Sequence, residues 1–111
     1  MAANEGDPRF YKILSQMAEV HHKKSADYGA GTDPLANLRA SVQFGIPAWI
    51  GAMIRAQDKM VRIQSFVRKA KLVNESVEDS LLDLASYAIL ALILFREQAE
   101  DSSGASSNCN G

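Results

Sequence analysis

The sequence predicts an all-α fold, and three features of its pattern support this prediction. Apolar residues recur every three to four positions in each long segment, which is the spacing of one face of a helix. Two Asp-Pro pairs and one Ile-Pro pair stand where helices would begin, because proline is favoured at the first helical position. No segment shows a convincing strand pattern. We therefore expect four helices, three long and one short.

The first two helices are predicted from their start and stop signals. Asp7 caps a helix that begins at Pro8 and runs to about Lys24. A stretch with two glycines then forms a turn or loop. A second Asp-Pro pair starts a short helix over residues 34–43, and Gly45 stands where its C-terminal cap is expected.

The other two helices are longer. The third opens at Ile46-Pro47 and runs to about residue 71, with a stripe of apolar residues at helical spacing. The fourth runs over residues 77–98. Ser76 and Asp79 stand three residues apart at its start, as in a capping box, although Asp is shorter than the usual Glu or Gln.

Length and charge limit the classes of protein to consider. The chain has 111 residues with 12 basic and 13 acidic side chains, which gives a formal net charge of −1. This length suits one domain, which we place at residues 8–100, between a flexible N-terminus over 1–7 and a disordered tail over 101–111. The near-balanced charge provides no basic excess for binding a nucleic-acid polymer.

The cellular compartment is predicted from cysteine usage and apolar runs. One cysteine, Cys109, excludes an internal disulfide and favours a reducing compartment. The longest apolar run, over residues 84–95, is too short to span a bilayer, which needs about 20 apolar residues. We expect a protein of the cytoplasm, without membrane association.

The predicted fourth helix is apolar on nearly every side in its C-terminal half. One stripe starts as Asp79, Asp83 and Ser86 and continues as Leu90 and Leu94. The opposite side carries Leu81, Leu84, Ala88, Ala91, Leu92 and Phe95. A helix that is apolar all round is central in its fold, and four helices surround it poorly in so short a chain. We therefore expect a homo-oligomeric helical bundle, most simply a two-fold dimer.

The two aspartates of the fourth helix are candidates for metal binding. Asp79 and Asp83 are neighbours on adjacent turns and repel each other unless a cation lies between them. Carboxylate oxygens favour Mg²⁺, and Glu19 and His22 on the first helix are candidates for the rest of the site. Alternatively, Asp79 interacts with the helix N-terminus, Asp83 pairs with an arginine, and Glu19 pairs with Lys23 on the surface.

The third helix carries the complementary charge. Arg55 and Arg62 lie within about 60° of each other around a helix, with Lys59 at the edge of this group. Arginine matches phosphate oxygens with two hydrogen bonds, and lysine adds a compact positive charge. The alternative is a solvated face with an Asp58–Arg62 salt bridge. To bind a nucleotide polyphosphate, a protein needs a site for a cation next to basic side chains that contact the phosphates, and the third and fourth helices together supply both.

Residues at the end of the first helix, in the loop after it and in the second helix complete the predicted ligand site. They are Lys24, Asp27, Tyr28 and Asn37. Tyr28 is suited to stacking on a base, and Asn37 to bonding with a base edge or a ribose hydroxyl. The alternative for each is ordinary turn and helix-start chemistry.

Four motifs together suggest a family. They are Lys24-Ser-Ala-Asp-Tyr-Gly, Asp33-Pro34 with Asn37, Arg55 with Asp58-Lys59 and Arg62, and Glu78-Asp79-Ser-Leu-Leu-Asp83-Leu-Ala85. Over about residues 10–97 the chain resembles small, largely phage-encoded domains associated with nucleotide metabolism or modification. Those domains are similar in turn to the all-α nucleoside-triphosphate pyrophosphohydrolases, the MazG-like and dimeric dUTPase group.

The resemblance implies a function. That larger group oligomerises, holds Mg²⁺ on Glu and Asp residues from two helices, and hydrolyses (d)NTPs to monophosphate and pyrophosphate. It implies that Asp79 and Asp83 are the catalytic pair here. The chain departs from the group because these aspartates are four residues apart instead of three, and because Glu19 alone stands for an earlier Glu-Glu-x-x-Glu cluster.

Two alternative functions remain open at this point. A site with fewer carboxylates favours a protein that binds and sequesters a nucleotide, or a nucleotide-derived signal, without hydrolysing it. The other alternative is a structural interaction domain whose working surface is the apolar fourth helix.

Overall fold

The computed structural model describes residues 5–27, 35–69 and 76–110. Within them the helices are α1 (Pro8–Asp27), α2 (Ala36–Arg39), the 3₁₀ helix η2 (Ala40–Phe44), α3 (Ala48–Lys69) and α4 (Val77–Asn110). This part of the chain contains no strand, which confirms the all-α class. The chain divides into two compact units, residues 1–36 and 37–111, and each is described by itself.

Helix α1 of the first unit begins as its Asp-Pro pair predicts. The Asp7 carboxylate accepts a hydrogen bond of 2.9 Å from the backbone N–H of Arg9, which caps the helix N-terminus. The Arg9 guanidinium also lies 2.6 Å from this carboxylate. Hydrogen bonds from the guanidinium, and then from the backbone N–H, lower the pKa of Asp7 below its ordinary value. The helix ends at Asp27, three residues beyond the predicted end.

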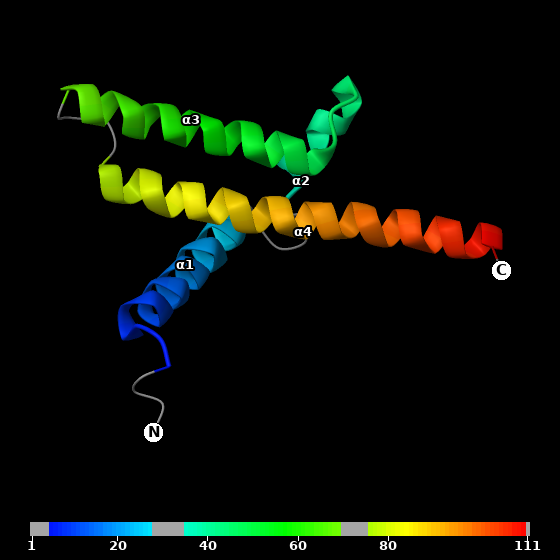
Figure 1. The fold of residues 1–111 in the computed structure, drawn as a ribbon, viewed down its shortest axis with the longest axis horizontal. Coiled ribbons are helices and arrows are strands. Elements are labelled where there is room, and N and C mark those ends of the chain that lie inside the picture. Colours follow the sequence, from blue (N-terminus) through cyan, green and yellow to red (C-terminus); the bar gives the residue numbers. More distant parts are fainter. Residues whose placement is uncertain (1–4, 28–34, 70–75, 111) are drawn as a thin grey trace. The chain divides into compact units, whose positions relative to one another are not determined.

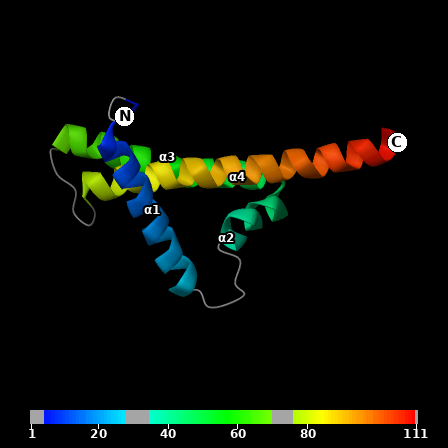
Figure 2. The ribbon, with the colours of Figure 1, turned by 90° about the horizontal axis from the view of Figure 1, so that it is seen from below.

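Helices α3 and α4 of the second unit lie side by side and run antiparallel (Figures 1 and 2). Two contacts define how they are aligned. The rings of Trp49 and Phe95 meet edge to face with centroids 5.4 Å apart. Farther along, Lys59 Nζ lies 3.0 Å from Asp83 Oδ2. The helices therefore stay in contact over several turns, and the start of α3 lies beside the middle of α4.

The residues of α3 and α4 that are most completely buried are mostly small. Ala52 and Ala56 of α3 are buried, as are Ser80 and Ala91 of α4, together with Leu94. Small side chains allow two helix backbones to approach closely, which helps to explain why these positions carry Ala and Ser. They also bury little apolar area, and several large apolar side chains of the hairpin, such as Ile54, Ile89 and Leu92, remain exposed.

Helix η2 packs against the start of α3. Ser41 Oγ lies 3.1 Å from the carbonyl oxygens of both Leu38 and Ile46, and so links the two ends of this turn. Gly45 closes η2 in the left-handed region with φ of 76°, as its predicted role as a C-terminal cap requires. The predicted short helix is therefore a single α-helical turn that continues as a 3₁₀ helix.

The start of α4 agrees with the prediction, but its end differs. Ser76 Oγ accepts a hydrogen bond of 3.0 Å from the backbone N–H of Asp79, which is one half of a capping box. The predicted end of this helix is near Gln98, whereas α4 continues to Asn110. No proline interrupts this segment, so the ladder of backbone hydrogen bonds continues. The division into a domain over residues 8–100 and a tail over 101–111 stays a prediction.

Two further observations complete the fold. In the described ranges, none of the helices combines the length and the apolarity that crossing a bilayer requires. The predicted start of the second helix at Asp33-Pro34, and the last two residues of the predicted third helix, lie outside the described residues.

The close approach of η2 to α3 makes Gly51 a test of the fold. A Cβ atom at Gly51 would lie 2.8 Å from Ser41 Oγ and 3.2 Å from the carbonyl oxygen of Leu38. We expect Gly51→Ala to lower the free energy of unfolding by about 1–3 kcal/mol through overpacking, although alanine is the better helix former. Urea denaturation measures this change.

The matched control removes the obstructing side chain. Ser41→Gly alone should lower stability, because the hydrogen bonds of Ser41 Oγ to Leu38 and Ile46 are lost. In that background Gly51→Ala should cost less than it does in the wild type, because both close side-chain atoms of residue 41 are then absent. An unfolding free energy that rises in the Gly51→Ala variant would contradict the tight contact.

Candidate functional site

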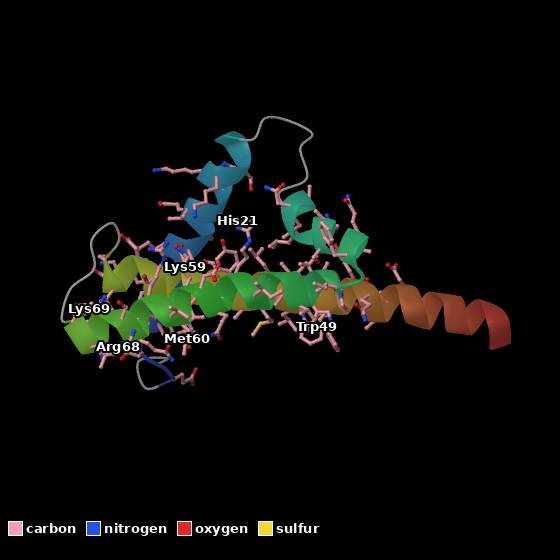
Figure 3. All side chains as sticks on the ribbon, turned by 90° about the horizontal axis from the view of Figure 1, so that it is seen from above. His21, Trp49, Lys59, Met60, Arg68 and Lys69 are labelled. Carbon is pink, nitrogen blue, oxygen red and sulfur yellow. The ribbon has the colours of Figure 1, made fainter. Side chains whose placement is uncertain are left out.

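The structure brings five of the predicted site residues to one side of the α3–α4 hairpin, which we call the polar edge. They are Arg55, Lys59 and Arg62 from α3, and Asp79 and Asp83 from α4. The contact between Lys59 and Asp83 joins the two sets. Positions three or four apart are neighbours on a helix surface, so the arginines flank Lys59 and Asp79 adjoins Asp83. Lys59 and Met60 leave α3 on different sides (Figure 3).

The ion pair at the centre of the polar edge is partly withdrawn from water. The side chain of Lys59 is 16% exposed and that of Asp83 is 31% exposed. A partly buried carboxylate requires a compensating charge, as the sequence of α4 predicts, and here the ammonium group of Lys59 supplies it. The residue beside Asp83 is thus a lysine of α3, where the alternative interpretation expected an arginine.

The other members of the polar edge are exposed. Arg55, Arg62 and Asp79 all present their side chains to solvent. Because α3 and α4 are antiparallel and Lys59 meets Asp83, Arg62 lies near the level of Asp79. The edge therefore has a half-buried neutralised centre with exposed charges at its ends, and these charges are accessible to a ligand from solution.

A second ion pair on the same side of α4 was not predicted. The Arg39 guanidinium pairs with the Glu97 carboxylate and so ties α2 to α4. Glu97 is fourteen residues beyond Asp83, which places it within about 40° of Asp83 around the helix. The polar stripe was expected to end in Leu90 and Leu94, so the seven-residue spacing of Asp83, Leu90 and Glu97 was the signal that was overlooked.

The predicted nucleoside-binding residues lie in different parts of the chain. Asn37 is exposed on α2, two residues before Arg39, and belongs to the second unit. Lys24 is exposed in the last turn of α1, in the first unit. Asp27 ends α1, but its side chain lies outside the described residues, as does all of Tyr28.

The predicted metal ligands are divided between the two units. Glu19 and His22 are exposed on α1, whereas Asp79 and Asp83 belong to the second unit. Where the structure describes the chain, no three His, Cys, Asp or Glu side chains form a group that could hold a metal ion. In the second unit, two carboxylates of which one is paired with Lys59 do not fit Mg²⁺ by themselves. The metal site stays a prediction.

Partial burial makes the central ion pair a contributor to stability that can be tested. We expect Lys59→Met to lower the free energy of unfolding by about 1–2 kcal/mol, because it leaves Asp83 partly buried without its cation. Arg62→Met is the matched control on the same helix, and we expect it to change stability by less than about 0.5 kcal/mol. If urea denaturation shows equal effects of the two substitutions on the free energy of unfolding, the Lys59–Asp83 ion pair does not contribute to stability.

Comparison with known proteins identifies the family. A family model described as "Nucleotide modification associated domain 1" matches residues 24–95. No curated protein and no solved structure matches the chain significantly. The matched region contains the whole polar edge together with Lys24, Tyr28 and Asn37, and it excludes Glu19 and His22. Because the match covers more than half of the sequence, this chain belongs to the family of nucleotide modification associated domains of type 1.

Proposed function

We propose that this domain binds a nucleotide, or a small molecule derived from one, and that the polar edge of the α3–α4 hairpin holds its phosphates. The Lys59–Asp83 ion pair carries the proposal, because it aligns the basic side of α3 with the acidic side of α4. The family description, which associates such domains with nucleotide modification, supports a ligand of this class.

The charges of the polar edge suit an anionic ligand. Arg55 and Arg62 are exposed one turn on either side of Lys59, about 10 Å apart along the helix axis. Each guanidinium is able to form two parallel hydrogen bonds with a phosphate group. Lys59 neutralises Asp83, so this carboxylate does not repel a phosphate placed between the arginines. For the nucleoside, Tyr28 and Asn37 stay the contacts predicted from the sequence.

Two further ligand contacts predicted from the sequence, Lys24 and Asp27, stay predictions. Both are within the region that matches the family, which supports their inclusion.

The second candidate function is Mg²⁺-dependent hydrolysis of a (d)NTP to monophosphate and pyrophosphate. The observation that favours it is the exposed carboxylate of Asp79, one turn from Asp83. It ranks below binding because Asp83 is already neutralised by Lys59 and no third carboxylate joins the pair in the second unit as described. Similarity to the MazG-like and dimeric dUTPase group, and the catalytic role of the two aspartates, belong to this second candidate.

Binding is tested with a panel of NTPs, dNTPs and cyclic nucleotides, with and without Mg²⁺, first by thermal shift and then by calorimetry. A ligand that binds the native state must raise the melting temperature. We expect Arg62→Ala to weaken the binding of the best ligand about 10-fold or more, because a charge-assisted hydrogen bond is lost. Arg68→Ala, on another side of the same helix, is the matched control and should bind as the wild type does.

The fate of the ligand separates the two candidates. If the domain only binds, the ligand is recovered intact after incubation with Mg²⁺. If monophosphate and pyrophosphate are recovered instead, and an Asp79→Asn variant no longer produces them, the domain is a hydrolase and the second candidate function replaces the first. Absence of any thermal shift across the panel, or equal effects of Arg62→Ala and Arg68→Ala, would overturn nucleotide binding at the polar edge.

A further inference from the structure

Helix α4 has a continuous seam on the side that faces away from α3. The seam residues are Glu78, Leu82, Ala85, Ile89, Leu92 and Arg96. They lie about 150° around the helix from Ser80 and Ala91, the residues buried against α3. Ile89 is 45% exposed and Leu92 is 47% exposed, although both are large aliphatic side chains. The remaining members are exposed, apart from the half-buried Leu82.

The spacing of the seam is that of a helix that packs against another helix. Its members follow one another at intervals of four, three, four, three and four residues. This is the alternation of the two core positions of a heptad repeat, which produces a narrow seam for helix–helix packing. Four apolar residues fill the middle of the seam, and one charged residue closes each end. The seam therefore fits another helix of similar length, about 27 Å from Glu78 to Arg96.

The order of residues in the seam indicates which helix that is. If a second copy of α4 packs antiparallel about a two-fold axis near position 87, Leu82 meets Leu92 of the other copy and Ala85 meets Ile89. Glu78 then meets Arg96 at both ends of the contact, so each end joins opposite charges. A parallel arrangement would instead place Glu78 against Glu78 and Arg96 against Arg96. The seam is thus complementary to itself in the antiparallel direction only.

We propose that two copies of this chain form a two-fold dimer through this seam, with their α4 helices antiparallel. The interface is isologous, because the same six residues contribute from each copy. Asp83 lies about 100° or more around α4 from every seam residue, whereas Asp79 lies about 60° from Leu82, so the dimer leaves Asp83 and the α3 side of each polar edge open. The interface therefore does not depend on the proposed nucleotide binding, and each can fail without the other.

Sedimentation equilibrium of the full chain tests the seam. We expect a dimer, and we expect Ile89→Lys to weaken it about 100-fold or more, because two ammonium groups would enter the apolar middle of the contact. Ile54→Lys is the matched control, since Ile54 of α3 is 50% exposed and lies outside the seam. It should leave the dimer unchanged. Far-UV circular dichroism checks that both variants remain helical.

Charge reversal tests the antiparallel direction. Glu78→Lys or Arg96→Glu alone places like charges together at both ends, and each should weaken the dimer about 10-fold. The double variant restores opposite charges and should recover most of the wild-type affinity. A wild-type chain that remains monomeric at about 100 µM would overturn the dimer. Equal effects of Ile89→Lys and Ile54→Lys, or a double variant as weak as the single ones, would overturn this interface.

Discussion

The ion pair between Lys59 and Asp83 is the constraint on which the polar edge depends. A carboxylate within an apolar helix is unfavourable unless a cation lies close to it, and in this chain the neighbouring helix supplies that cation. The pair therefore orients α3 on α4 as well as neutralising Asp83. It also places Arg55 and Arg62, one turn to either side, along the junction of the two helices. The same ion pair that neutralises Asp83 thus creates a surface with exposed positive charge.

Local signals in the sequence were enough to predict the elements of the fold. Asp7 and Ser76 cap helices where expected, and Gly45 closes the short segment in a left-handed conformation, because each effect depends on a few adjacent residues. The end of α4 was placed too early, since Ser, Gly and Asn are poor helix formers but none of them forbids a helix as proline does. Where no proline or capping residue marks the end of a helix, the end depends on small differences in helix propensity, and it is therefore hard to predict.

Contacts between distant residues were harder to predict. Asp83 was expected to need a cation, yet the sequence could not choose between a metal, an arginine and Lys59, because the alignment of α3 on α4 depends on packing along their whole length. The small residues Ala52, Ala56, Ser80 and Ala91 contribute to that alignment together with the ion pair, and their burial is visible only when the helices are placed together. The Arg39–Glu97 pair was missed for the same reason, since the two residues are 58 positions apart in the chain.

Close packing through small residues has a further consequence for α4. Because Ala and Ser bury little area, α3 cannot cover the large apolar residues that extend around most of α4, and Ile89 and Leu92 remain exposed. If α4 is central in its fold, as its sequence predicts, another helix must cover these exposed apolar residues. The self-complementary order of the seam favours a second copy of α4 in this role. Its sides then have separate roles: Ser80 and Ala91 face α3, Asp79 and Asp83 contribute to the polar edge, and Ile89 and Leu92 form the seam. A substitution on one side consequently reports on one interaction of α4 and leaves the others in place.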